Sequence, residues 1–157
     1  MAKANSGNNK KNQFQPSRGG IAYVALLRTA DKMKTHFETV FAPFDITGQQ
    51  YNVLRILRGA EPEGLPTLTI AERMIERAPG ITRMIDRLEA KELVWRENCP
   101  NDRRRVYCGI TEKGLNLLEL LDAPVVKKNE VFHGLSEVEL AQLTALLEKV
   151  WKDLESK

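Results

Sequence analysis

The stretch from Thr69 to Thr111 reads TIAERMIERAPGITRMIDRLEAKELVWRENCPNDRRRVYCGIT and decides how the rest of the chain is organised. Thr69 and Glu72 are spaced as in a capping box and predict a two-turn helix beginning there. A second helix is predicted from Pro79, because proline suits a first helical turn, where its missing N–H would have no partner. Four apolar residues at helical spacing then predict a side that faces the core: Ile81, Met84, Ile85 and Leu88.

The opposite side of this second helix is polar. It carries Arg83, Asp86 and Arg87, with Gly80 and Thr82 near the first turn. A short helix, a turn and a second helix with outward arginines indicate a helix-turn-helix, whose second helix fits the major groove of DNA.

A basic hairpin is predicted directly after the second helix. Residues 93–95 (LVW) and 106–110 (VYCGI) form its strands, and residues 97–102 (ENCPND) contain the turn formers between them. Residues 102–105 (DRRR) lie at the tip, and Leu68 is expected to add a third, minimal strand. Together these elements predict a winged helix-turn-helix, with the wing placed for the phosphate backbone and the minor groove.

Several motifs in this stretch resemble the MarR family of bacterial transcription regulators. They are residues 88–91 (LEAK) before Leu93-Val94, residues 101–104 (NDRR) and residues 110–114 (ITEKG). Residues 81–88 (ITRMIDRL) stand where the recognition helix of that family lies, and the resemblance runs from about 45 to 118. Two positions depart from the family pattern: Ile75 replaces the usual glycine of the turn, and Arg77 replaces the usual Ser or Thr cap.

The predicted fold is mainly α with a small β-wing (α+β), a winged helix-turn-helix domain flanked by N- and C-terminal dimerisation helices. Residues 1–18 are read as a disordered basic tail and residues 19–44 as a dimerisation helix ended by Pro43. Residues 45–110 form the DNA-binding domain, and residues 111–157 form C-terminal dimerisation helices with a break at 133–135.

Capping signals and apolar spacing mark the flanking helices. Thr47 with Gln50 and Ser136 with Glu139 form capping boxes, and Thr111 is expected to cap the helix after the wing. The last helix carries a heptad seam with more apolar surface than a surface helix needs on one side. We expect this seam to pair with the apolar first helix between two subunits, which matches the dimers of the resembled family. The seam residues are Leu140, Leu143, Leu147, Val150 and Leu154.

Charge is distributed unevenly along a chain whose formal net charge is +3. Lys and Arg number four against no Asp or Glu in residues 1–18, nine against seven in 67–110, and six against nine in 111–157. Basic segments suit phosphate contacts. There is no apolar run of about 18 residues and no signal peptide, so no membrane contact and a cytoplasmic location are expected.

A two-fold dimer would place its recognition helices about 34 Å apart, so double-stranded DNA with a near-palindromic operator is the expected partner. Thr82 and Arg83 are expected to contact base edges, and Arg77 and Arg87 to hold phosphates. The resemblance implies that Asp102 braces Arg104 in the minor groove, with phosphate contacts from its neighbours. A solvated helix face with Asp86 as the partner of the arginines is the competing interpretation. The predicted DNA-binding set is Arg77, Pro79, Gly80, Thr82, Arg83, Arg87, Asp102, Arg103, Arg104 and Arg105.

The resemblance also implies repression that a small aromatic or anionic effector relieves by entering a crevice between the dimer helices and the DNA-binding lobe. Candidate residues for this site come from the first two helices, with plain core packing as the competing interpretation. They are His36, Phe37, Phe41, Tyr51 and Arg55.

No nucleophile with a base, glycine-rich phosphate loop or paired carboxylates appears, so we predict neither an enzyme nor a cofactor. The two histidines, His36 and His133, are too far apart in sequence to predict a metal site. Two other functions stay open. One is a redox-switched regulator through Cys99, whose neighbouring arginines would lower the pKa of its thiol, with structural roles for Cys99 and Cys108 as the alternative. The other is a winged helix that contacts proteins and no DNA.

Overall fold

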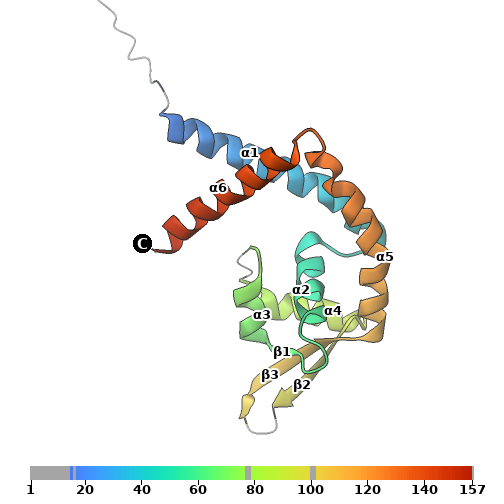
Figure 1. Ribbon diagram of the computed structural model, residues 1–157. Coiled ribbons are helices and arrows are strands. Elements are labelled where there is room, and N and C mark those ends of the chain that lie inside the picture. The colour runs from blue at the N-terminus through green and yellow to red at the C-terminus, as the bar shows by residue number, and fades with distance from the viewer. Residues whose placement is uncertain (1–14, 16, 77–78, 100–101, 157) are drawn as a thin grey trace, which may run out of the picture. The chain divides into compact units, whose positions relative to one another are not determined.

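The computed structural model describes residues 15, 17–76, 79–99 and 102–156, with their side chains except at positions 99, 102–105 and 129. The chain forms two units, residues 1–34 and residues 35–157. The first unit contains most of the first helix, and the second contains all the later elements (Figure 1). In chain order the elements are α1 (Arg18–Phe41), η1 (Ala42–Phe44), α2 (Gly48–Arg58), β1 (Leu65–Pro66), α3 (Thr67–Arg73), α4 (Ile81–Ala90), β2 (Val94–Cys99), β3 (Asp102–Ile110), α5 (Glu112–Lys128), η2 (Asn129–Phe132) and α6 (Glu137–Glu155).

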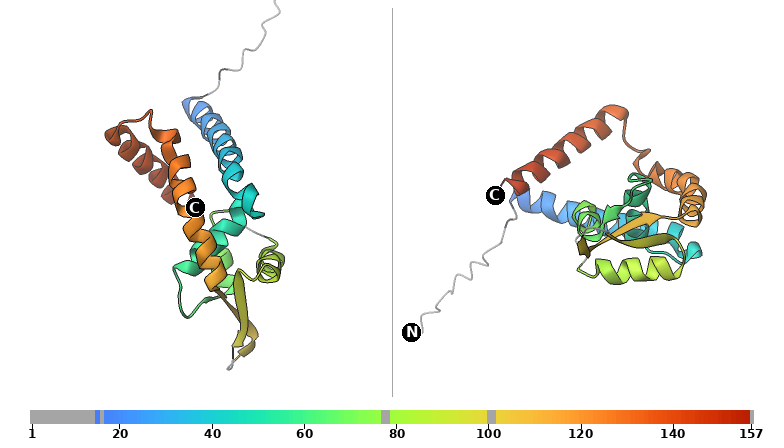
Figure 2. Two further views of the ribbon diagram at one scale, coloured as in Figure 1. Left: turned by 90° about the vertical axis from the view of Figure 1, so that its right-hand side faces the viewer. Right: turned by 90° about the horizontal axis from the view of Figure 1, so that it is seen from below.

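A small antiparallel sheet joins the helices of the second unit. Its strand order is β1-β3-β2, with Leu65 opposite Cys108 and Val94 opposite Ile110. Helix α4 lies alongside β2 (Figure 2). The mainly α fold with a small β-wing is therefore confirmed.

The hydrophobic core lies where α2, α3, α4, the sheet and α5 meet. Helix α2 contributes three side chains that are fully buried, and each of the other elements contributes one or two. Burying a Leu or Ile side chain stabilises a fold by about 1.5–3 kcal/mol, so this cluster holds α4 and the sheet in place. Its fully buried members are Val53, Leu54, Leu57, Ile70, Ile85, Leu88, Cys108, Leu118 and Leu121.

Three predicted helix caps are confirmed. Thr47 Oγ1 accepts from Gln50 N at 3.2 Å, and Gln50 Oε1 accepts from Thr47 N at 3.0 Å. Ser136 and Glu139 form the same reciprocal pair at the start of α6. Thr111 Oγ1 accepts from the backbone N–H of Gly114 at 3.1 Å, at the start of α5. Each cap satisfies backbone donors that a helix start leaves without partners.

The predicted start of the first helix of the pair was wrong. Helix α3 begins at Thr67 with Pro66 as its N-cap and no side-chain cap, so Thr69 and Glu72 lie inside it. The third strand is Leu65–Pro66 and not Leu68, which belongs to α3 and is 70% exposed. Pairing of Pro66 with Tyr107 brings the chain into the sheet just before the helix, and this long-range pairing sets where α3 begins.

The second helix and the hairpin also differ from their predicted bounds. Helix α4 begins at Ile81 with Gly80 as N-cap, so Pro79 precedes the helix in a turn. The hairpin strands extend to Cys99 and resume at Asp102, so Asp102–Arg105 belong to β3 and not to a turn. Polar residues such as Glu97 are exposed in the paired strand, because a projecting two-stranded ribbon does not bury them.

The C-terminal segment breaks earlier than predicted. Helix α5 ends at Lys128 and η2 follows at once, with residues 133–135 in the turn before α6. Within the described residues α6 buries no side chain in its own chain, although its heptad positions are apolar. No helix among the described residues has the length and apolar character needed to cross a membrane.

Candidate nucleic-acid interface

Helix α4 has one buried face and one exposed face, as predicted. Ile85 and Leu88 are fully buried, and Ile81 and Met84 are partly buried beside them. Four of the exposed polar residues of α4 are those predicted for its outer side. They are Thr82, Arg83, Asp86 and Arg87.

The start of α4 is open. The N-cap residue is Gly80, so no side chain caps the helix by a hydrogen bond, and a Cβ added at Gly80 would meet no atom within 4 Å. Pro79 is exposed beside it. The first backbone N–H groups of a helix carry partial positive charge, so an uncovered start suits an anion next to the arginines. Arg77, which precedes this turn, lies outside the described residues.

Four of the predicted DNA-binding residues line one groove. Pro79, Gly80, Arg83 and Arg87 meet the start of α2 around a cavity of about 360 Å³. Sequence reasoning missed the α2 side of this groove, formed by Thr47, Gln49 and Gln50. The capping box at Thr47 was the available signal, since it marks a helix N-terminus that can face the same ligand as α4.

Asp86 is not the partner of the arginines on its own helix. Its carboxylate Oδ1 accepts from Arg96 Nη2 of β2 at 2.5 Å. Within the described part of the chain, neither Arg83 nor Arg87 takes part in an ion pair. Arg96 was not predicted as a functional residue, and its sequence position alone does not show that it reaches α4.

The wing is the hairpin of β2 and β3, whose far end projects from the helices (Figure 1). Trp95 lies opposite Gly109, and the missing Cβ at Gly109 makes room for the indole, because a Cβ there would lie 2.2 Å from its ring. Residues 102–105 lie on β3, but their side chains are outside the description, so the pairing of Asp102 with Arg104 stays a prediction.

The predicted effector residues separate into two groups. Phe41 is buried and stacks on Tyr51 with ring centroids 4.7 Å apart, and Arg55 Nη1 donates to the Tyr51 hydroxyl at 3.0 Å. His36 instead lines a cavity of about 670 Å³ between the end of α1 and the end of α5. Lys127, Lys128 and His133 line the same cavity, and Phe37 is not among its lining residues.

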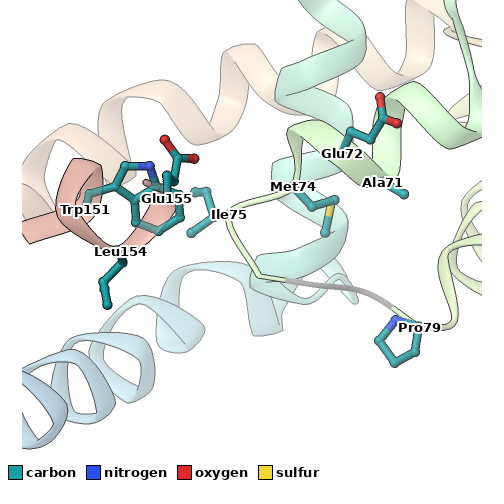
Figure 3. A pocket seen from close by; sticks show the side chains of 8 residues that line it. All are labelled: Ala71, Glu72, Met74, Ile75, Pro79, Trp151, Leu154 and Glu155. Carbon is teal, nitrogen blue, oxygen red and sulfur yellow. The ribbon is translucent and has the colours of Figure 1, made fainter. Parts of the chain in front are cut away.

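A second groove joins the turn between α3 and α4 to the end of α6. Ile75, which is 82% exposed, lines it together with Trp151 and Leu154 (Figure 3). The groove measures about 1040 Å³ and also includes Pro79. An exposed isoleucine in the helix-turn-helix therefore adds apolar surface next to the predicted DNA-binding residues.

Comparisons with known proteins agree with this arrangement. A model described as the MarR family matches residues 46–106. The crystal structure of a MarR transcription factor from Planctomyces limnophilus is 40% identical, covers 92% of this chain and 100% of its own, and has a TM-score of 0.66. The S. aureus MepR–DNA complex is 28% identical with a TM-score of 0.76, covering 83% of this chain and 97% of its own. The HTH-type transcriptional regulator MhqR of Bacillus subtilis is 28% identical over 129 residues, 82% of this chain and 88% of MhqR.

Proposed function

This chain belongs to the MarR family of transcription regulators, and on that premise we propose that it binds an inverted-repeat DNA operator as a homodimer and represses transcription until a small molecule releases it. Members of this family regulate transcription, so the chain is a regulator and not an enzyme. The observation that carries the proposal is the exposed face of α4, where Arg83 and Arg87 lack ion-pair partners among the described residues.

Helix α4 is the proposed reading helix. Thr82 and Arg83 stand near its open start and are assigned to base edges, where an arginine can donate two hydrogen bonds to guanine. Arg87 is assigned to a phosphate, with the start of α2 on the other side of the same groove. The S. aureus MepR structure with a similar fold was determined as a complex with DNA, which supports this assignment.

The wing is the proposed second contact. Residues 102–105 bring one carboxylate and three arginines to the hairpin, where a ribbon can reach the minor groove beside the major groove that α4 enters. Arg104 is assigned to the minor groove with Asp102 bracing it, and Arg103 and Arg105 to phosphates. These assignments rest on the sequence and on the family resemblance.

The apolar surface that the chain leaves exposed supports a homodimer. Leu147, Val150 and Leu154 on the α6 seam are 42%, 51% and 67% exposed. Helix α1 exposes Val24 and Leu27 as well. Large apolar side chains gathered on one helix are costly in water and mark an interface, and a second copy supplies the same two helices as the partner surface.

Release by an effector is proposed as a population shift. A ligand that binds better to a subunit spacing incompatible with adjacent major grooves lowers DNA affinity by that difference in binding free energy. The cavity that His36 lines suits an aromatic acid, because Lys127 and Lys128 outnumber the one carboxylate, Glu130, and Val40, Phe44 and Val131 supply apolar walls. Phenolic acids should slow hydrogen exchange around His36, and unchanged exchange there would remove this site.

The function is tested by fluorescence anisotropy with DNA from upstream of the gene, titrated at several salt concentrations. We expect tight binding of one dimer per palindrome and a salt slope of several released ions, because each arginine on a phosphate displaces about one counterion. Equal affinity for scrambled DNA of the same length would contradict the proposal. It would leave either an operator elsewhere or a winged helix that contacts proteins, and failure to bind any DNA in low salt would favour the second of these.

A further inference from the structure

We infer that Arg96 is a positioning residue for DNA reading: it fixes the orientation of α4 relative to the wing and thereby determines how selectively Thr82 and Arg83 read bases. The inference rests on the proposed function, and it assigns a role to a side chain that is itself not expected to contact DNA.

Arg96 reaches from β2 to three residues that span about two turns of α4. Its Nη2 donates to the Thr82 carbonyl oxygen at 3.2 Å and to Asp86 Oδ1 at 2.5 Å. Its Nε lies 3.4 Å from Glu89 Oε2. Thr82, Asp86 and Glu89 are spaced four and three residues apart, so they lie in one row along the helix, and a single guanidinium spans that row.

These contacts are partly shielded from water. The Arg96 side chain is 23% exposed, and those of Asp86 and Glu89 are 52% and 45% exposed. Arg96 is therefore the shielded member of the link, and its charge is screened by salt less than that of an exposed arginine. The planar guanidinium presents several donors in a fixed arrangement, which a lysine ammonium on a flexible stem cannot reproduce.

The apolar packing of α4 does not by itself determine its rotation about its own axis. Ile85 and Leu88 are buried, but hydrophobic burial is not directional, and small rotations of a helix preserve most of it. Hydrogen bonds are directional, so the bonds from Arg96 restrict this rotation. A base-reading side chain must be held within about 0.5 Å and 10–20° of its productive geometry, so a small rotation matters.

Arg96 also connects the helix to the strands of the wing. It is paired with Cys108 of β3, the strand that runs back to residues 102–105. One side chain therefore joins the major-groove element to the proposed minor-groove element. If both must reach adjacent grooves together, their relative orientation decides which sequence binds best.

The three contacts of Arg96 with α4 differ in kind. The bonds to Thr82 and Asp86 satisfy hydrogen-bond geometry, whereas Arg96 Nε is buried without a hydrogen-bond partner in the described chain, and its Glu89 contact is an ion pair only. The two hydrogen bonds thus hold α4 from Thr82 to its middle at Asp86, on either side of Arg83.

The test compares Arg96→Lys with the original protein on cognate and scrambled DNA at several salt concentrations. Lysine keeps the positive charge and lacks the planar set of N–H donors of the guanidinium. Discrimination is the dissociation constant for scrambled DNA divided by that for cognate DNA. We expect this ratio to fall about tenfold, which is in the range that one good base contact contributes. Affinity for scrambled DNA should change by less than about twofold, because Arg96 is not assigned to a phosphate and its positive charge is retained.

Asp86→Asn approaches the same contact from the helix. It should also reduce discrimination, and the double variant should lose no more than Arg96→Lys alone, since Asp86→Asn weakens one of the contacts that Arg96→Lys already disrupts. This second route keeps the inference testable if a change at Arg96 prevents folding.

Arg58→Met is the matched control. Arg58 donates two hydrogen bonds to Asp122, at 3.0 and 3.3 Å, and is similarly shielded at 30% exposure, but this pair joins α2 to α5. We expect lower stability with discrimination retained.

Two outcomes overturn the inference. One is full discrimination in Arg96→Lys, and the other is an equal loss in Arg58→Met, which would make the effect one of stability alone. If the original protein itself shows no preference for its upstream DNA, the proposed function fails first, and the positioning role fails with it.

Discussion

The arginines of α4 and those of β3 are expected to contact DNA in different ways. Arg83 stands near the open start of α4 and is assigned to a base, whereas Arg104 comes from the wing and is assigned to the minor groove and backbone. A contact to the backbone strengthens binding to every sequence, and a contact to a base edge distinguishes sequences. Single substitutions separate these two roles.

Arg104→Ala should weaken binding to all DNA and reduce the salt slope by about one ion, because one positive charge is removed from the minor groove, where the negative potential is strong. Arg83→Ala should in addition relax sequence preference, at a cost of about 1–3 kcal/mol on cognate DNA. Binding isotherms on cognate and scrambled DNA at several salt concentrations measure both effects. An unchanged affinity for Arg104→Ala would remove the wing from the interface.

Cys108 should be chemically inert in the folded protein. It is fully buried next to the Thr67 hydroxyl, and burial raises the pKa of its thiol, so the reactive thiolate is scarce at neutral pH. In a Cys99→Ser variant, labelling by a thiol reagent should be slow until urea is added. Rapid labelling of the native variant would contradict the inertness of Cys108. Release of DNA by peroxide in the original protein but not in Cys99→Ser would favour the redox-switched alternative through Cys99.

The start of α5 shows why a helix can require a glycine for packing. Thr111 Oγ1 donates to the Glu92 carbonyl oxygen at 2.7 Å and caps the helix at Gly114. This arrangement presses the first turn against the chain before β2, where a Cβ on Gly114 would lie 2.3 Å from the Leu93 carbonyl oxygen. The atom that such a Cβ would meet belongs to the backbone, so rotating a side chain cannot relieve the overlap.

Gly114→Ala should therefore lower the free energy of unfolding by about 1–3 kcal/mol, the usual cost of overpacking. Urea denaturation followed by circular dichroism measures it. Gly134→Ala is the control, because a Cβ at Gly134 meets nothing within 4 Å. Equal stability of the two variants would show that the α5 start can shift at little cost.

The complete regulator is proposed to be a pair of chains, since α6 leaves its apolar seam exposed. An operator with two half-sites is bound tightly only when both recognition helices are held at a spacing of about 34 Å. DNA affinity should therefore depend on α6 even though α6 is not assigned to DNA.

Leu147→Asp should convert the dimer into a monomer in sedimentation experiments, because it places a charge within the apolar seam. Operator affinity should fall at least about tenfold, since half-sites would then be bound one at a time. Gln142→Asp adds the same charge to α6 away from the seam and should change neither property. A dimeric Leu147→Asp protein would place the subunit interface elsewhere.

Features that depend on neighbouring residues were predictable from the sequence. The capping boxes at Thr47 and Ser136 were confirmed, and so was the buried side of α4. A cap involves residues three positions apart, and amphipathic spacing extends over one or two helical turns. Both signals can therefore be recognised in the amino-acid sequence alone. The exposed arginines followed from the same spacing, because one buried face of a helix defines the opposite one.

Features that depend on distant residues were settled only by the tertiary structure. The start of α3 followed from the pairing of Pro66 with Tyr107, and the local signal at Thr69 pointed to the wrong residue. The link from Arg96 to Asp86 and the groove between α2 and α4 likewise join segments that local spacing does not relate. The physical reason is that strand pairing and side-chain contacts across elements depend on where the core places each backbone, and local sequence patterns contain no such distance.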